Sequence, residues 1–309
     1  DIGQNPSELY DPIHYLLSLG GKRIRPVLCL LTYSLFKSDW EKQVPAALAV
    51  EIFHNFTLMH DDIMDKAPLR RGKQTVHAKW NDNIAILSGD VMLVNAYQYL
   101  NKAKGLSLAD FQHLLGRLSR IAAEVCEGQQ FDMNFESRDD VTVEEYMEMI
   151  RLKTSVLIGF SMEMGGLLAS VPSSVSDSLY RIGETIGLGF QLKDDLLDVY
   201  GDPEKFGKQP GGDILANKKT YLLIKAFEKA SGSLLSDLTR WVSATEYDAA
   251  EKVKAVTAIY DSLGLKAETE AVISTYFDAA FAEIQSLAIS ADQKSALVKF
   301  MSGLVDREV

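Results

Sequence analysis

The chain has few of the residues that interrupt helices or cross-link a fold. Its 309 residues include only two cysteines and eight prolines. Two cysteines exclude a disulfide-rich scaffold and a cysteine-based zinc framework. Cys29 and Cys126 lie in apolar stretches, where we expect buried free thiols. No proline falls within 69–171 or 211–309, so two long stretches lack the strongest helix breaker.

Long apolar runs and an excess of positive charge are also missing. No run approaches the length that spans a bilayer, and the opening residues are polar without signal-peptide character, so we expect a cytoplasmic protein with no membrane span. The chain begins at Asp1 rather than Met, and we expect its N-terminus to be trimmed. Lys and Arg number 32 against 43 Asp and Glu, a net charge of −11. This balance argues against a nucleic-acid partner but allows an anionic ligand wherever basic residues gather.

Helical periodicity fills the stretches between the prolines. Apolar residues recur at spacings of three and four, as at Ile84, Leu87, Val91 and Val94, and strand-like alternation is absent. The sequence therefore predicts an all-α fold, in a single domain over 1–309 because no linker or repeat appears. The expected helices cover 26–36, 45–65, 82–104, 108–135, 142–170 (with a Thr142–Glu145 capping box), 174–201, 218–230, 233–242, 247–263, 265–287 and 291–305, and 66–72 is expected to be a polar loop.

Two aspartate clusters share one pattern, DDIMD at 61–65 and DDLLD at 194–198. Residues four apart share a helix face, whereas the second aspartate of each cluster lies about 100° round the helix. Carboxylates this close repel each other unless a cation binds, and oxygen ligands suit Mg²⁺ or Mn²⁺. A single cluster in an acidic protein is usually a solvated face. Two copies, each after an apolar segment, indicate a metal site completed by substrate phosphates.

Basic residues gather beside these acids. Gly20–Pro26 (GGKRIRP) places three cations in a glycine-led turn that enters a helix, and Arg70 and Arg71 follow the first cluster. His54 lies one heptad before Asp61 on the same expected helix, where it can reach the same phosphate. The alternatives are solvated surface lysines and simple ion pairs. The set is completed by Lys153, Lys193, Lys208 and Lys218.

Six ordered motifs resemble the trans-isoprenyl diphosphate synthases of the polyprenyl synthetase family over essentially the whole chain. They are GGKRIRP at 20–26, EIFHNFTLMHDDIMD at 51–65, LRRGKQTVH at 69–77, KT at 153–154, GFQLKDDLLD at 189–198 and GGDILANKKT at 211–220. The resemblance implies an isoprenoid (terpene) synthase fold, a helical bundle around a deep central cavity, and a homodimer. It also implies a prenyltransferase of isoprenoid biosynthesis that joins isopentenyl diphosphate head to tail to an allylic diphosphate.

The resemblance further implies a role for each matching residue. Asp61 and Asp65 resemble the ligands of two Mg²⁺ ions and Asp194 that of a third, supported by Asp195 and Asp198, with Mn²⁺ as a substitute. The isopentenyl diphosphate site is implied at Lys22, Arg25, His54 and Arg71. The allylic diphosphate and cation-stabilising set is implied at Arg70, Lys153, Thr154, Gln191, Lys208 and Lys218.

Residues just before the first aspartate cluster are expected to set the product length. Phe56 lies five residues before Asp61, Thr57 four and Phe53 eight. A bulky aromatic followed by a small residue, with no insertion in the motif, resembles geranylgeranyl diphosphate synthases, so we predict a twenty-carbon product, with farnesyl diphosphate as the alternative. Two alternatives stay open. Phe56 can be an ordinary core residue, and the residue that stops chain growth can be Phe53 or one on the helix that carries Met92 and Leu93.

Two other function classes fit the motifs less well. A terpene cyclase lacks a GGKRIRP site and usually carries an Asn-Ser-Glu type second metal motif. A non-catalytic subunit of a heteromeric synthase typically loses one aspartate cluster, and both are intact here. The expected helix at 82–104 is apolar on more than one face, which predicts burial inside one subunit or, as the resemblance favours, at a homodimer interface.

Overall fold

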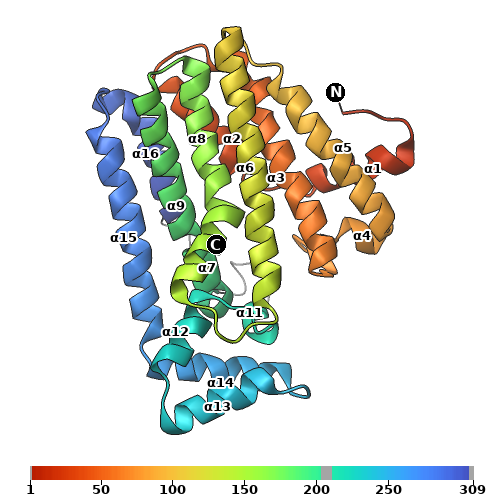
Figure 1. Cartoon of the computed structure of the whole chain (residues 1–309), viewed down its shortest axis with the longest axis vertical. Helices are drawn as coiled ribbons and strands as arrows, with labels where there is room; N and C mark the ends of the chain where they lie inside the picture. Colours follow the sequence, from red (N-terminus) through yellow and green to blue (C-terminus); the bar gives the residue numbers. More distant parts are fainter. Residues whose placement is uncertain (1, 203–210, 306–309) are drawn as a thin grey trace. The chain divides into compact units, whose positions relative to one another are not determined.

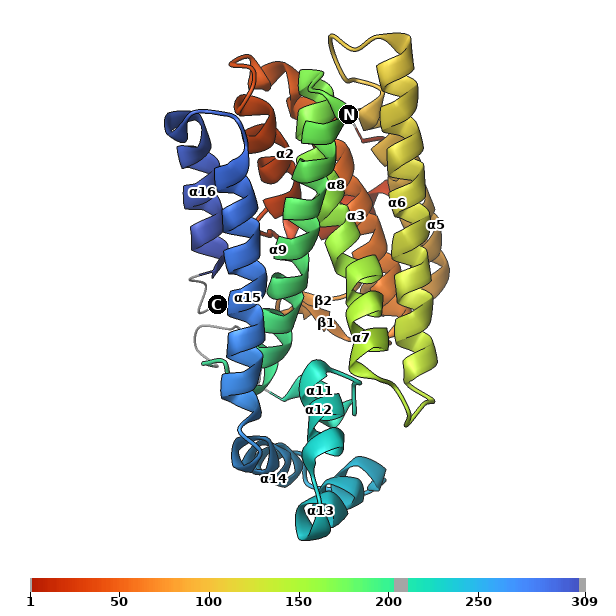
Figure 2. The same cartoon turned by 60° about the vertical axis from the view of Figure 1, so that its left-hand side comes forward.

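The computed structural model describes residues 2–202 and 211–305 (Figures 1 and 2). Contacts among residues divide the chain into two compact units. Unit 1 comprises Asp1–Ser119, Phe160–Tyr180 and Asp292–Leu297, and unit 2 comprises Arg120–Gly159, Arg181–Ala291 and Val298–Val309. A single domain over 1–309 stays a prediction.

Helices make up most of the described structure, which confirms the all-α prediction. They are α1 (Ser7–Ser18), α2 (Ile24–Ser34), the 3₁₀ turn η1 (Trp40–Gln43), α3 (Val44–Met64), α4 (Val76–Lys79), α5 (Asp82–Leu100), α6 (Leu108–Phe135), α7 (Val143–Ile150), the π-helical turn η2 (Arg151–Ser155), α8 (Val156–Ala169), α9 (Ser173–Tyr200), α11 (Gly212–Leu215), α12 (Tyr221–Lys229), α13 (Gly232–Ser243), α14 (Ala249–Ser262), α15 (Leu265–Ser286) and α16 (Ala291–Val305). Two short strands, β1 (Leu69–Arg70) and β2 (Lys73–Gln74), are the only ones in the described ranges. No described helix combines the length and apolarity needed to cross a membrane.

The structure departs from the predicted elements in a few places. Helix α1 was not predicted, because Pro12 inside it reads as a helix breaker. The predicted helix 142–170 begins at the expected Thr142 capping box but contains a π-helical turn. The predicted loop 66–72 includes strand β1. Both cysteines are free, yet only Cys29 is buried; Cys126 is exposed, which corrects its predicted burial.

Unit 1 is organised around the packing of α3 against α5, which lie side by side in Figure 1. Helix α3 begins with Pro45 in its first turn, as predicted, and buries Phe53 and Met59. Helix α5 buries Met92 and Ala96. Because α3 is held along its length, the aspartate cluster at its C-terminal end has a fixed support.

In unit 2, α15 runs beside the C-terminal part of α9, as both views show (Figures 1 and 2). This part of α9 carries the second aspartate cluster and buries Leu192 and Leu196. Helices α13 and α14 pack against each other, and α14 also contacts α11, α12 and α15. The short helix α11 therefore lies between the end of α9, to which it is hydrogen-bonded through Asp198, and α14.

Candidate active site

A tight hairpin in unit 1 holds the two predicted arginines. Strands β1 and β2 pair antiparallel with Arg70 opposite Lys73. The two connecting residues, Arg71 and Gly72, both have positive φ values, 52° and 73°. This is the geometry of a type I′ turn, and glycine adopts it without steric cost. The hairpin thus fixes the backbone positions from which the side chains of Arg70 and Arg71 extend.

Arg70 is bound to the middle of the first aspartate cluster. Its Nε donates to both carboxylate oxygens of Asp62, at 2.9 and 2.8 Å, and its Nη2 lies 2.7 Å from Oδ1. The same Nη2 lies 3.6 Å from Oδ2 of Asp61. Asp62 is only 2% exposed, and burial raises its pKa although Arg70 opposes the shift. Asp62 therefore fixes Arg70, which also lies beside Asp61.

The glycine-led turn before α2 is shaped by Arg23. This residue has a left-handed backbone, with φ 52°, and its guanidinium donates to the carbonyls of Gly20 and Leu17, each at 2.8 Å. It also donates to the carboxylate of the buried Glu51 at 2.9 Å. Arg71 donates to the same Gly20 carbonyl. The turn and the hairpin are therefore joined directly, and Arg23 serves the fold of the turn.

Several cations surround His54 on α3. Burial lowers the pKa of His54 well below its ordinary value, and repulsion from Arg25, Arg70, Arg71 and Arg23 adds to the shift. The imidazole is consequently neutral at pH 7, and four guanidinium groups lie within electrostatic range of it. A bound diphosphate would compensate this concentration of positive charge through charge-assisted hydrogen bonds. The structure thus brings the predicted Arg25, His54 and Arg71 together, and Lys22 is exposed in the same turn.

In unit 2, one carboxylate aligns two predicted lysines. Lys153 lies in the π-helical turn η2, a distortion that often marks functional sites. Its Nζ donates to Asp132 of α6 at 2.6 Å, and Nζ of Lys218 lies 3.9 Å from the same oxygen. Burial opposes ionisation of Asp132, but Lys218 and Lys153 together hold its pKa below the ordinary value. Gly128 allows the close approach, because a Cβ there would lie 2.3 Å from the backbone nitrogen of Lys153.

A second network connects Thr154 to Gln191. The Thr154 hydroxyl donates to Oε1 of Gln191 at 3.0 Å, and Nε2 of Gln191 donates to Asp195 at 2.9 Å. The hydroxyl of Tyr146 donates to the other oxygen of Asp195 at 2.5 Å. Burial is the main cause that raises the pKa of Asp195. Because a carboxylate only accepts, Asp195 orients the Gln191 amide so that its oxygen faces Thr154.

The last aspartate of the second cluster holds α11. The carboxylate of Asp198 accepts from the backbone N–H of Asp213 at 2.9 Å, and its carbonyl accepts from that of Gly211 at 2.5 Å. Asp194, one turn earlier on α9, is half-buried. The two aspartates on this face therefore differ: Asp198 anchors a neighbouring segment with one of its oxygens.

The donor set at both clusters fits a hard divalent cation. Helices α3 and α9 end among aspartates and have no basic residue in the last turn, where the helix dipole disfavours negative charge. A cation bound by Asp61, Asp65 or Asp194 would offset that cost. Within the described ranges, no group of three or more His, Cys, Asp and Glu residues could enclose a metal ion. Mg²⁺ typically binds one or two carboxylates and takes its other ligands from water and phosphates, so a pair of aspartates on one helix face suits it.

The predicted chain-length residues form an aromatic row on α3. Phe53 is fully buried and Phe56 is 8% exposed, with their ring centroids 5.5 Å apart. The ring of His60 meets that of Phe56 edge-on at 4.8 Å, and its Nε2 lies 3.1 Å from the carbonyl oxygen of Ile86 on α5. The Thr57 hydroxyl donates to the carbonyl of its own helix at His54. Phe56 is thus held between two rings.

Two residues of these networks were missed from the sequence, and one predicted residue lies outside the structure described. Asp132 looked like one acid among many, because its lysine partners lie far from it in the sequence. Tyr146 has the pattern of an ordinary core residue, and nothing local shows that its hydroxyl meets Asp195. Lys208 falls outside the described residues.

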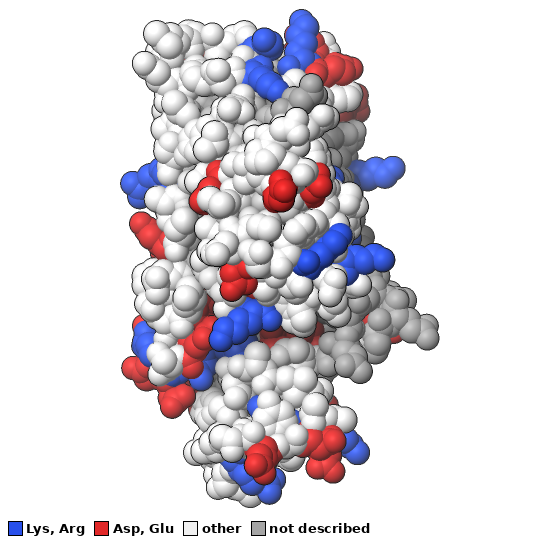
Figure 3. Space-filling model, turned by 90° about the vertical axis from the view of Figure 1, so that its right-hand side faces the viewer, with Lys and Arg blue, Asp and Glu red and all other residues white. Residues whose placement is uncertain are grey.

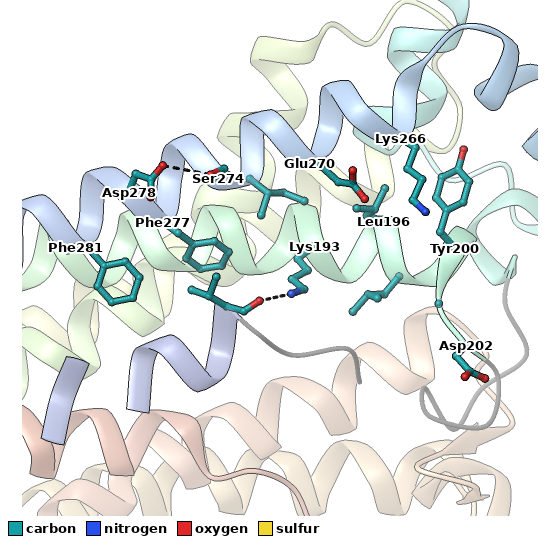
Figure 4. Close-up of a pocket in the computed structure, with 14 residues that line it drawn as sticks. Lys193, Leu196, Tyr200, Asp202, Lys266, Glu270, Ser274, Phe277, Asp278 and Phe281 are labelled. Carbon is teal, nitrogen blue, oxygen red and sulfur yellow. Dashed lines mark hydrogen bonds between the residues drawn. The ribbon is translucent and has the colours of Figure 1, made fainter. Parts of the chain in front are cut away.

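A separate cavity of about 590 Å³ opens in unit 2 between α9, α15 and the end of α16 (Figure 4). Its wall includes Lys193 and Tyr200 of α9, and Phe277 and Phe281 of α15. The amine of Lys193 donates to the carbonyl of Val305. Lys193 lines this cavity, whereas Asp194, Asp198 and the two lysines at Asp132 do not.

Comparisons with known proteins give the relatives of this chain and the solved structures that it resembles. The polyprenyl synthetase family matches residues 6–260. A geranylgeranyl diphosphate synthase of Methanosarcina mazei is 43% identical over 224 residues, which are 72% of this chain and 69% of that protein. A crystal structure of a geranylgeranyl pyrophosphate synthase matches with a TM-score of 0.93 and 44% identity, over 99% of this chain and 94% of the other. A Caulobacter crescentus polyprenyl synthase, complexed with calcium and isoprenyl diphosphate, matches with a TM-score of 0.89 and 27% identity, over 100% and 92% of the two chains.

Proposed function

We propose that geranylgeranyl diphosphate is the product of this chain, which belongs to the polyprenyl synthetase family and is a prenyltransferase with the all-α isoprenoid synthase fold. The reaction is the head-to-tail condensation of isopentenyl diphosphate with allylic diphosphates. The observation that carries this proposal is the group of four arginines around a neutral His54, beside an aspartate cluster. The names of the Methanosarcina relative and of the first solved structure support the product.

Two groups of side chains bind the two diphosphates in this proposal. Isopentenyl diphosphate is held by Lys22, Arg25, His54 and Arg71, where the neutral imidazole adds a hydrogen bond without adding charge. The allylic diphosphate is held by Arg70, Lys153 and Lys218, and by Lys208, which lies outside the described residues. Asp62 and Asp132 support the proposal, because each carboxylate fixes basic groups of the allylic set.

The family depends on divalent metal ions, and the proposal assigns three Mg²⁺ ions to Asp61, Asp65, Asp194 and Asp198. When bound, Mg²⁺ neutralises the charge that develops on the leaving diphosphate. The Caulobacter relative, whose structure is a complex with calcium and isoprenyl diphosphate, supports a divalent cation in the proposal. Mn²⁺ prefers the same oxygen ligands and is expected to substitute.

The side chains stabilise charge separation rather than transfer protons. Arginine and lysine side chains stabilise the diphosphate as the carbon–oxygen bond of the allylic substrate breaks. The hydroxyl of Thr154 and the amide oxygen of Gln191 place partial negative charge near the allylic carbocation, with the amide oriented by Asp195. The double bond of isopentenyl diphosphate attacks the cation, and the departed diphosphate removes the proton. This explains why no acid–base pair is found in the motifs.

Product length is assigned to the aromatic row on α3. A chain that grows from Asp61 back along the helix meets Phe56 after about 7.5 Å of helix axis. Phe56 is braced by Phe53 on one side and His60 on the other, so its ring resists displacement. A fixed aromatic at this distance supports a short product.

We also propose that the protein is a homodimer that pairs through α5. The inner face of α5 is buried in unit 1, yet Leu87 and Val94 are 58% and 56% exposed and Ile86 is 42% exposed. Figure 3 faces the side on which Figure 1 places α5, and broad surfaces there carry no charged residues. Exposed apolar patches of this kind mark interaction surfaces. A second copy of the chain would cover the outer face, as the all-round apolarity of the helix suggests.

The function is tested by metal-dependent turnover with both substrates. The purified protein is mixed with geranyl diphosphate, labelled isopentenyl diphosphate and Mg²⁺, and the products are identified by mass spectrometry. Incorporation of label into geranylgeranyl diphosphate supports the proposal. Cyclised hydrocarbon from the allylic substrate alone would indicate a terpene cyclase, and no turnover at all would indicate a non-catalytic subunit.

A further inference from the structure

Lys252 on α14 is a lysine with no exposed surface. Its Nζ donates to Oδ1 of Asn217 at 2.7 Å and lies 4.2 Å from the centroid of the Tyr247 ring. Burial lowers the pKa of this amine. Both partners are neutral, so among the residues that the structure describes it is a dipole and an aromatic face, and no carboxylate, that compensate the desolvation of the ammonium group. A methionine would fill the space without that cost, which indicates a role for the ammonium group itself.

The partner of this lysine, Asn217, sits at a strained point of the chain. It has φ 51°, a left-handed conformation that asparagine tolerates better than most residues. Its Oδ1 accepts from Lys252, and its Nδ2 donates to the carbonyl of Val242 at 3.0 Å. The hydroxyl of Tyr247 donates to the carbonyl of Leu215 at 3.2 Å. Side chains and backbone of the α13–α14 region, visible in Figures 1 and 2, therefore fix the end of α11 at three points.

The residue that follows Asn217 is Lys218, whose backbone N–H donates to the carbonyl of Asp213 at 2.9 Å. Its amine lies 3.9 Å from Asp132, the carboxylate that also holds Lys153. A residue with left-handed φ and ψ angles changes the direction of the backbone at the residue that follows it. The conformation of Asn217 consequently determines where the side chain of Lys218 begins.

We propose that Lys252 is a positioning residue for the prenyl transfer reaction. Its buried ammonium group holds Asn217 in the left-handed conformation, and this aims Lys218 at Asp132 and at the allylic diphosphate. The other end of α11 is held by Asp198, so this short helix is fixed at both ends. The inference rests on the proposed function, in which Lys218 binds the allylic substrate.

The test compares Lys252→Met with Lys254→Met, a matched change at an exposed lysine on the same helix. Steady-state kinetics use geranyl diphosphate and isopentenyl diphosphate with Mg²⁺. We expect Lys252→Met to raise the KM for geranyl diphosphate about tenfold, the effect of one weakened charge-assisted contact, and to change the KM for isopentenyl diphosphate less than about twofold. Lys254→Met should match the unmodified protein. Asn217→Gly, which permits the same backbone conformation without the amide, should reproduce the shift even if Lys252→Met fails to fold.

A double-mutant cycle separates positioning from general weakening of the fold. In a Lys218→Met background, Lys252→Met should change the KM for geranyl diphosphate less than about twofold further, because coupled residues are not additive. Additive effects, or an equal rise in both KM values, would overturn the positioning role while leaving the proposed function intact. A Lys218→Met variant with an unchanged KM for geranyl diphosphate would instead overturn the assignment of Lys218, and the positioning role with it.

Discussion

Truncating Phe56 should lengthen the product by one five-carbon unit. The ring of Phe56 lies between those of Phe53, at 5.5 Å, and His60, at 4.8 Å. With Phe56→Ala, the next large side chain on the way back along α3 is Phe53, which is fully buried. The residue that stops growth of the prenyl chain therefore changes from Phe56 to Phe53, and the dependence of turnover on the metal stays the same.

The size of the step follows from the helix. Phe53 and Phe56 are three residues apart, which is about 4.5 Å along the axis. A five-carbon unit adds four chain bonds of about 1.5 Å each, roughly 5 Å when extended, so the added length is close to one further unit and far short of two. Loss of a buried phenylalanine side chain should also lower the free energy of unfolding by about 3–5 kcal/mol.

The assay is the chain-length distribution of products from geranyl diphosphate and labelled isopentenyl diphosphate. The expected result is a shift from twenty to twenty-five carbons, with no shift in Phe227→Ala, which truncates a 37% exposed phenylalanine on α12. An unchanged distribution in Phe56→Ala would refute the assignment of Phe56. If Phe53→Ala or Met92→Ala then lengthened the product, that residue would stop chain growth instead.

Three further predictions follow from the same geometry. Asp61→Ala should reduce turnover by several orders of magnitude, and near-normal turnover of this variant would remove Asp61 from the metal site. Chelation of Mg²⁺ should abolish turnover while circular dichroism still reports a helical fold. Arg71→Ala should mainly raise the KM for isopentenyl diphosphate, and Arg70→Ala should mainly raise the KM for the allylic substrate. Each lost contact should weaken binding by about 1.5–3 kcal/mol. Identical shifts of both KM values in the two variants would contradict the two separate sites. Val94→Asp should convert the dimer into monomers in sedimentation at micromolar concentration, and an unmodified protein that is already monomeric would contradict the interface on α5.

Most of the helices could be predicted because their signals are local. The proline-free stretches, the spacing of apolar residues and the Thr142 capping box place the main helices within a few residues of their observed ends. Helix α1 was missed because its apolar face outweighs Pro12, which local rules read as a break. The π-helical turn was not predicted, and its close contact with Gly128 joins residues that are far apart in the sequence.

The candidate site was predictable in its residue types and less so in its contacts. Sequence spacing put Asp61 and Asp65 on one face, but it could not show that Asp62 is used to hold Arg70. Three neighbouring cations in the glycine-led turn looked equivalent, whereas Arg23 binds the turn itself. Asp132 became visible only through its lysine partners, because such long-range pairs leave no local pattern in the sequence.

In the proposed reaction, this chain extends an allylic diphosphate by successive addition of isopentenyl units and stops at twenty carbons. The most direct measurement is mass analysis of the products that the unmodified protein forms from geranyl diphosphate, labelled isopentenyl diphosphate and Mg²⁺. We expect geranylgeranyl diphosphate that carries two labelled units, and no product when the metal is chelated. Products that end at fifteen carbons, or an absence of labelled prenyl diphosphate, would contradict this expectation.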